Sequence, residues 1–337
     1  MSSTEPGSRG RALILALMVA VGLAGGVGPT ESHAGQPPST PVTIGYASIG
    51  GAMAGVWVAK EAGLFAQEHL RADLVFMSGT LAMQALVSRE VGFTLADGSM
   101  GVRAALAGAD VALLATAVNS MIFSVVARPG VRRLDDLRGK RVAVSRLGAA
   151  ADYNLRYVLK LHGIRPDRDV AILQFGSIPN NLAALEQGGV EAAVTSYPTT
   201  ARAKRAGFVE VADFAALNVP FQHTGLWSSR GQMRASPELV RAVLRAYVGG
   251  VRRFKAEREL GMAALGKYTR LTDRVILEQT YDYYAPRFPD PPYPSLEGLK
   301  LVLEDLTASD PRAATARPAQ FVELAPLQQV LREVPPR

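Results

Sequence analysis

The strongest constraint on the fold is a regular alternation of short apolar runs with amphipathic segments through residues 42–230. Short apolar runs bounded by Gly, Ser, Asp or Pro predict β-strands, and apolar residues at helical spacing predict the helices between them. Repeated strand–turn–helix units favour an α/β fold with mainly parallel sheets covered by helices. The expected strands are 42–46, 73–77, 91–96 and 111–117 in a first block, 122–127, 141–145, 170–175, 191–195 and 209–211 in a second, and 224–229.

The two blocks predict two lobes, and 337 residues suit two domains. The chain passes to the second block near 118–121 and recrosses near 213–223, which predicts a hinged clamshell with a ligand cleft between the lobes. The pattern is mostly helical after residue 236, including helices near 272–284, 295–306 and 318–331, and this tail is expected to pack on the first lobe. The expected domains are 42–120 with 222–337 as lobe one and 121–221 as lobe two.

The N-terminus predicts export. Arg9 and Arg11 precede an apolar run at 12–27, and Ser32-His33-Ala34 follows with small residues at the positions that a signal peptidase reads. A membrane anchor is the alternative, but the run has about 16 residues against the roughly 20 that a spanning helix needs. We therefore expect a cleaved signal peptide at 1–34, a disordered leader at 35–41 and a periplasmic mature protein.

Composition excludes several classes of function. The formal net charge is +7, but basic and acidic residues are interspersed, without the basic stripe that would indicate nucleic-acid binding. Cysteine is absent, which excludes disulfides, thiolate nucleophiles, cysteine zinc sites and a lipid-anchoring cysteine. The four histidines form no H-x-x-x-H pair, so we expect no metal site, no cofactor and no catalytic residue. A monomer is expected.

The predicted strands end in small or polar turns that lead into helices. Ligands of open parallel sheets bind beyond the carboxyl ends of the strands, where helix N-termini present free N–H groups to anions. The candidate ligand-binding residues are Ser48, Gly50, Ser78, Gly79, Thr80, Asp97, Gly98, Ser99, Asn119, Arg146, Gly148, Asn180 and Tyr197.

Several candidates have a structural alternative. Ser48, Ser78 and Ser177 are either ligand contacts or helix caps and turn residues, and Asp97 is either a cap or a counter-ion for a ligand amine. Arg146 either pairs with an acidic ligand group or lies on a solvated rim. Asn119 and Tyr197 either line the cleft or serve a turn and the packing, whereas His223, Trp57 and Trp227 are expected to be packing residues.

Four stretches resemble the nitrate/sulfonate/taurine family of ABC-transporter substrate-binding proteins. They are IGY at 44–46, AKEAGLF at 59–65, LDDLRGKRVAV at 134–144 and the segment 183–193 with its GGVEAA. The resemblance implies a type II periplasmic-binding-protein fold, a small-molecule ligand and a permease partner in the inner membrane. It also implies ligand contacts at Ser48, Gly79, Asp97, Ser99, Asn119, Gly148 and Tyr197.

The expected function is therefore delivery of a small organic ligand, anionic or zwitterionic, such as a sulfonate or carboxylate, to an ABC importer. One alternative is a sensor of the same fold that signals to a membrane receptor. The other is an enzyme acting on a small organic acid, but the chain has no G-x-S-x-G elbow and its glycines at 45–55 do not fit G-x-G-x-x-G.

Overall fold

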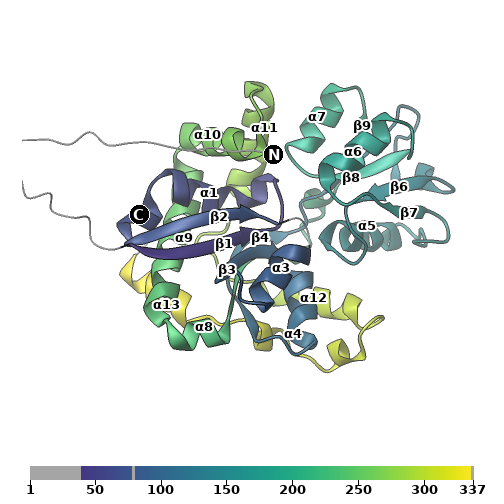
Figure 1. Cartoon of the computed structure of the whole chain (residues 1–337). Coiled ribbons are helices and arrows are strands. Elements are labelled where there is room, and N and C mark those ends of the chain that lie inside the picture. Colours follow the sequence, from purple (N-terminus) through teal and green to yellow (C-terminus); the bar gives the residue numbers. More distant parts are fainter. Residues whose placement is uncertain (1–38, 78–79, 335–337) are drawn as a thin grey trace, which may run out of the picture. The chain divides into compact units, whose positions relative to one another are not determined.

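Ten strands form two five-stranded sheets in the computed structural model, which describes residues 39–77 and 80–334. The first sheet has the order β2-β1-β3-β10-β4 and the second the order β7-β6-β8-β5-β9 (Figure 1). The first contains β1 (Thr40–Tyr46), β2 (Leu70–Phe76), β3 (Phe93–Asp97), β4 (Val111–Ser120) and β10 (Pro220–Ser229). The second contains β5 (Ser124–Ala127), β6 (Arg141–Val144), β7 (Ala171–Gln174), β8 (Ala192–Thr195) and β9 (Val209–Asp213).

One strand of each sheet runs against the others. β10 is antiparallel to β3 and β4, and β5 is antiparallel to β8 and β9. These are the strands that follow the two crossings, at 121–123 and 214–219. Each crossing leaves the carboxyl end of one sheet and starts the next strand at the facing edge of the other, so that strand must run away from the gap. Both sheets therefore turn their carboxyl ends toward each other.

Helices cover the faces of both sheets. On the first are α1 (Ala54–Glu61), α2 (Leu64–Gln67), α3 (Thr80–Val87), α4 (Gly98–Leu106), α8 (Arg230–Ala235), α9 (Pro237–Ala256), α10 (Arg258–Thr269), α11 (Arg274–Tyr284), α12 (Leu296–Leu306) and α13 (Ala325–Glu333). On the second are α5 (Ala150–Leu161), α6 (Ile178–Glu186) and α7 (Thr199–Arg205). Short 3-10 helices are η1 (Gly51–Met53), η2 (Leu134–Leu137), η3 (Phe214–Leu217), η4 (Ala285–Arg287), η5 (Pro311–Ala314) and η6 (Pro318–Phe321).

The helical tail packs on the first sheet, as the sequence predicts. α9 lies against α1, and α12 lies against β10 and α4. Trp57 and Trp227 are fully buried in this part of the core, in agreement with their predicted packing role. Gly63 ends α1 with a positive φ of 68°, a conformation that costs glycine little.

Two predicted segments differ from the structure. β10 begins at Pro220, inside the expected connector, and its central residues are buried on both faces, so the sequence lacks the alternation of a half-buried strand. The helix expected at 318–331 is broken, because Val322 bridges Leu113 on β4 and the Glu323 N–H donates to the Leu113 carbonyl (2.9 Å). This contact covers the edge strand β4, whose free backbone groups need partners.

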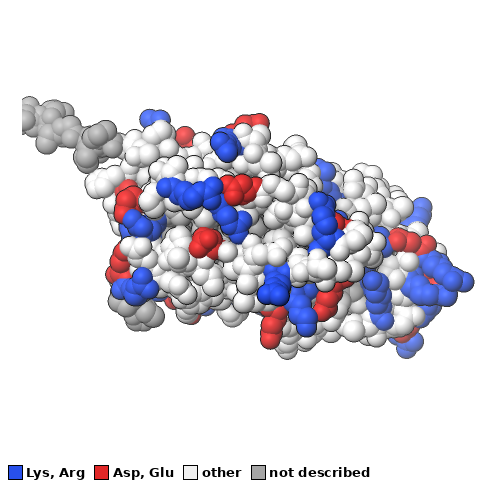
Figure 2. Space-filling view, turned by 90° about the horizontal axis from the view of Figure 1, so that it is seen from below, with Lys and Arg blue, Asp and Glu red and all other residues white. Residues whose placement is uncertain are grey.

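The N-terminal predictions fall mostly outside the described residues. The signal peptide at 1–34 lies wholly outside them, and β1 starts at Thr40, two residues before the expected strand. Among the helices that the structure describes, none is both long and apolar enough to cross a membrane. On the face shown in Figure 2, basic and acidic side chains are interspersed, without a stripe of one sign.

Candidate ligand-binding site

A cavity of about 610 Å³ lies where the carboxyl ends of the two sheets face each other. Its walls come from the carboxyl ends of β1, β3, β6, β7 and β8 and the segments after them, from the first crossing and from β10. It brings together six of the predicted residues, namely Ser48, Gly50, Asp97, Arg146, Asn180 and Tyr197. The volume is in the range of small-molecule sites and exceeds what a three- or four-atom inorganic anion would fill.

The other predicted residues do not line this cavity or lie outside the described chain. Ser78 and Gly79 are outside the described residues, and Thr80 is exposed at the start of α3. Ser99 is buried within α4, and Asn119 is half-buried near the end of β4. A Cβ added to Gly98 would lie 2.3 Å from the Gln222 carbonyl oxygen, so this glycine serves close packing. Gly148 has a positive φ of 74°, a backbone conformation that favours glycine.

Asp97 is the N-cap of α4. Its carboxylate accepts the Met100 N–H (3.0 Å) and the Ser99 hydroxyl (2.6 Å), and the Ala150 N–H at the start of α5 donates to it from the second lobe. Burial raises the pKa of Asp97, and these hydrogen bonds oppose the rise. The cap interpretation is therefore confirmed, although the residue also lines the cavity.

Two of the cavity serines also have local roles. Ser48 Oγ accepts the Gly50 N–H (3.0 Å) in the turn after β1, and Ser177 Oγ caps α6 by accepting the Asn180 N–H (3.3 Å). Both remain on the cavity wall with Asn180. A side chain can cap a helix and still face a ligand, because the cap uses only part of its hydrogen-bonding capacity.

Two arginines give the cavity its charge. Arg146 follows β6, and its Nε is buried without a hydrogen-bond partner. Arg202, on α7, lines the cavity from an exposed position. Within the described parts of the chain, neither side chain forms an ion pair or hydrogen bond, and Asp97 is the only carboxylate on the described wall. The wall thus has a positive excess and offers two free donors to an anion.

Sequence reasoning missed Arg202 and the apolar part of the wall, which includes Phe76, Phe123 and Tyr284. The signal for Arg202 is its position one helical turn after Tyr197-Pro198, on the helix that a predicted strand end introduces. Tyr197 lines the cavity and also stacks on Tyr283 with ring centroids 4.4 Å apart, so both interpretations of this residue apply.

His223 was expected to be a packing residue, and the structure places it on the cavity wall. It is 7% exposed, and its Nδ1 lies 2.6 Å from the Thr224 hydroxyl. Its Nε2 is buried without a partner among the described residues. Burial lowers the pKa of His223 to about 3, so the ring is neutral at physiological pH.

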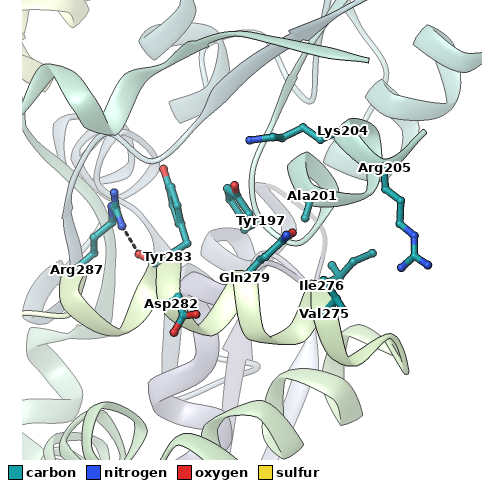
Figure 3. Close-up of a pocket in the computed structure, with 10 residues that line it drawn as sticks. All are labelled: Tyr197, Ala201, Lys204, Arg205, Val275, Ile276, Gln279, Asp282, Tyr283 and Arg287. Carbon is teal, nitrogen blue, oxygen red and sulfur yellow. Dashed lines mark hydrogen bonds between the residues drawn. The ribbon is translucent and has the colours of Figure 1, made fainter. Parts of the chain in front are cut away.

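A second cavity of about 600 Å³ lies between α7 and α11 (Figure 3). Its cations are already engaged: Lys204 pairs with Glu210 (2.6 Å), and Arg205 pairs with Asp273. Figure 3 shows Tyr283 between Tyr197 and Arg287, whose guanidinium lies 3.9 Å from the Tyr283 ring centroid. Lys204 and Arg205 are neutralised by carboxylates, and Arg287 donates to the Tyr283 carbonyl, so this cavity is a weaker candidate for an anion than the first.

Two α/β lobes that face one cavity with the carboxyl ends of their sheets define a periplasmic-binding-protein clamshell, which confirms the expected fold class. A family profile described as NMT1/THI5 like matches residues 51–257, and the chain belongs to this family. The resemblance to nitrate- and sulfonate-type substrate-binding proteins is thereby confirmed. A comparison with curated protein sequences gives no match.

Three solved structures illustrate the likeness. A protein from Bordetella bronchiseptica RB50 has a TM-score of 0.77 and 18% identity, with 89% of this chain and 99% of that chain covered. The alkanesulfonate-binding protein SsuA from Xanthomonas axonopodis pv. citri, bound to MOPS, has a TM-score of 0.69 and 21% identity, covering 86% and 100%. The nitrate-binding protein NrtA from Synechocystis PCC 6803 has a TM-score of 0.71 and 13% identity, covering 89% and 90%.

Proposed function

We propose that this protein is an extracytoplasmic solute-binding protein that captures a small organic anion between its lobes and delivers it to an ABC importer. The observation that carries the proposal is the pair of arginines, Arg146 and Arg202, that face the cavity without a partner in the described chain. For Arg146, whose Nε is buried, a cationic group without a counter-ion is costly, and an anionic ligand removes that cost. Arg202 is exposed and adds a second positive charge to the same wall.

The size and lining of the cavity support an organic ligand over nitrate. A volume of about 610 Å³ with Phe76, Phe123 and Tyr284 on the wall offers apolar surface that an inorganic ion cannot use. A carboxylate or sulfonate on an apolar or aromatic body satisfies both the arginines and this surface. The sulfonate MOPS bound to SsuA, a protein of the same fold, is consistent with such a ligand.

The proposal includes export and a transport partner, and it assigns no catalytic step. The signal-like segment at 1–34 supports a mature chain that starts at Gly35 in the periplasm. Sequencing the N-terminus of the exported protein tests this start. Membership of the family supports an inner-membrane permease as the partner. The cavity histidine has a threonine rather than a carboxylate on its Nδ1, so no catalytic triad is formed.

A thermal-shift panel tests the ligand class. Sulfonates (including MOPS), carboxylates, zwitterions and neutral heterocycles are added at saturating concentration, and a ligand that binds the folded state raises the melting temperature. We expect hits among the organic anions. Hits confined to neutral or cationic compounds would contradict the proposal.

Arg146→Gln tests the counter-ion. Because hydrogen bonds to charged groups contribute about 1.5–3 kcal/mol, the variant should bind the best anion of the panel roughly 10- to 100-fold more weakly by calorimetry. Arg133→Gln is the matched control, since the Arg133 side chain is 72% exposed in the same lobe and does not line the cavity. Equal affinities of the two variants for this anion would show that Arg146 does not bind the ligand.

A further inference from the structure

His223 lines the cavity, and one nitrogen of its ring has no hydrogen-bond partner in the described chain. The residue lies on β10, in the floor that the first sheet gives to the site, next to Thr224, which pairs in register with Asp97. Its side chain is more than nine-tenths buried, and its Nε2 has no hydrogen-bond partner among the described residues. Buried polar atoms in native proteins are almost always satisfied, so this atom is expected to meet a group that the chain itself does not supply.

The ring is held in one orientation. Nδ1 is tied to the Thr224 hydroxyl at 2.6 Å, and Phe123 packs on the ring with a centroid separation of 5.1 Å, while Phe221 lies edge-on at 6.4 Å. These contacts hold one nitrogen and pack two aromatic rings against the imidazole. Nε2 is therefore a preorganised hydrogen-bonding atom, which loses little rotational freedom when a ligand binds.

The neighbouring polar group on the same floor is already satisfied. Asp97 accepts hydrogen bonds from Met100, Ser99 and Ala150, so its carboxylate is engaged by the chain. Because burial keeps the imidazole uncharged, His223 cannot act as a second cation for the anionic group. A neutral imidazole nitrogen makes one hydrogen bond, as a donor or as an acceptor according to its tautomer, and Arg146 already provides for the anionic end of the ligand.

We propose that His223 Nε2 determines ligand specificity by hydrogen-bonding an uncharged polar group of the ligand. The ligand would then be bifunctional: one end is an anion held at Arg146, and a second position carries a hydroxyl, amide or ring heteroatom that reaches His223. This inference rests on the proposed function, since it assumes that the cavity holds an organic anion.

A site with a buried polar group rejects analogues that leave the group unpaired. The effect is expected to be about 10-fold for each hydrogen bond that a ligand fails to make. The probes are benzenesulfonate and benzoate, each compared with its three ring-hydroxylated isomers. A hydroxyl is a suitable probe because it can donate or accept, which makes the result independent of the tautomer of His223.

Calorimetry on the protein should show that at least one hydroxylated isomer binds roughly 10-fold more tightly than its parent. In His223→Phe, which keeps a ring of similar size, the ratio between the same two compounds should fall to about 1. Equal ratios in the wild type and in His223→Phe would overturn the inference.

A measurement on the wild-type side chain covers the case in which the variant does not fold. In protein labelled with ¹⁵N-histidine, the preferred hydroxylated isomer should shift the Nε2 signal of His223, and its parent should not. The signal is assigned by replacing the exposed His69 and His162 with Gln in turn. An Nε2 signal that responds equally to both compounds would also overturn the inference.

Different results would contradict the proposed function and the role of His223. If no organic anion binds and Arg146→Gln changes nothing, the proposed function is wrong, and the inference falls with it. If anions bind the wild type and are lost in Arg146→Gln while the hydroxyl has no effect through His223, only the inference is wrong.

Discussion

Asp97 connects the two lobes through a single carboxylate. Its oxygens accept hydrogen bonds from the first turn of α4 and from Ala150 at the start of α5, a helix of the other lobe. A negative charge at these two helix N-termini is favourable, since both present free N–H groups and the positive end of the macrodipole. Asp97 thus takes an anion position that a ligand would otherwise be expected to fill.

Two substitutions of Asp97 separate its cap role from its charge. Asp97→Ala removes the acceptor for Met100 and Ser99, and should lower the free energy of unfolding by about 1 kcal/mol. Asp97→Asn keeps an acceptor oxygen at the cap and should change stability by less than about 0.5 kcal/mol. Urea unfolding measures both, with the slope unchanged. An equal loss in the two variants would show that the charge, and not the cap, stabilises the fold.

Local residues of the site were predictable and distant ones were not. Asp97 and Ser177 stand directly before helices, so their cap positions follow from short-range sequence. Arg202 and His223 reach the cavity only because α7 and β10 are placed there by contacts far along the chain. No local pattern shows that the Nε2 of a lone histidine lacks a partner.

At the level of elements, α1 and α9 meet through glycine. A Cβ on Gly250 would lie 2.2 Å from the Gly55 carbonyl oxygen and 2.7 Å from the Ala59 Cβ, which leaves no room for a methyl group. The close approach lets α9 bury its apolar face against the helix that follows the first cavity turn. The position of the Ser48–Gly50 turn therefore depends on this contact.

Gly250→Ala should destabilise the protein by about 2 kcal/mol, because overpacking costs roughly 1–3 kcal/mol and exceeds the gain in helix propensity. Gly249→Ala is the matched control on the same helix, since its Cβ would meet only the end of the Leu64 side chain at 3.0 Å. The control should be neutral or slightly stabilising in the same urea experiment. A neutral Gly250→Ala would mean that the two helices separate without cost.

Comparison of the predicted and observed elements shows which of them a local sequence pattern cannot identify. Apolar runs and glycine positions predict most of the strands and the end of α1 at Gly63. β10 does not, since its buried Gln222 is satisfied inside the core by Thr116 and by the Ser295 N–H. A polar residue whose hydrogen-bond partners are distant in sequence favours a loop prediction, and only the packed structure shows that it belongs to a strand.

At the scale of the whole molecule, Tyr283 links the lobes to both crossings. Its single hydroxyl hydrogen is shared between the Ile122 carbonyl (3.1 Å) in the first crossing and the Asp213 carboxylate (3.2 Å) just before the second. Its ring stacks on Tyr197 of the other lobe. A hinge motion that opens the cavity must change the Tyr197–Tyr283 contact, because the two residues come from different lobes.

Small-angle scattering tests this coupling. Saturating anion should reduce the radius of gyration of the wild type, since a ligand that contacts both lobes favours the closed arrangement. Tyr283→Ala should enlarge the ligand-free radius, because it removes the stack and both hydrogen bonds. Tyr293→Ala, an exposed tyrosine outside both cavities, should leave the radius unchanged. Identical radii with and without ligand would contradict the hinge.

Arg146 and Arg202 belong to the same lobe, whereas the floor opposite them is formed by neutral His223 and the engaged Asp97. Under the proposed function, an anionic solute that enters the opened protein is attracted by one lobe only. Its charged end would bind to the two arginines of that lobe at first encounter, before the second lobe closes on it. The first lobe would then select the charge of the ligand, and the second lobe its remaining polar groups.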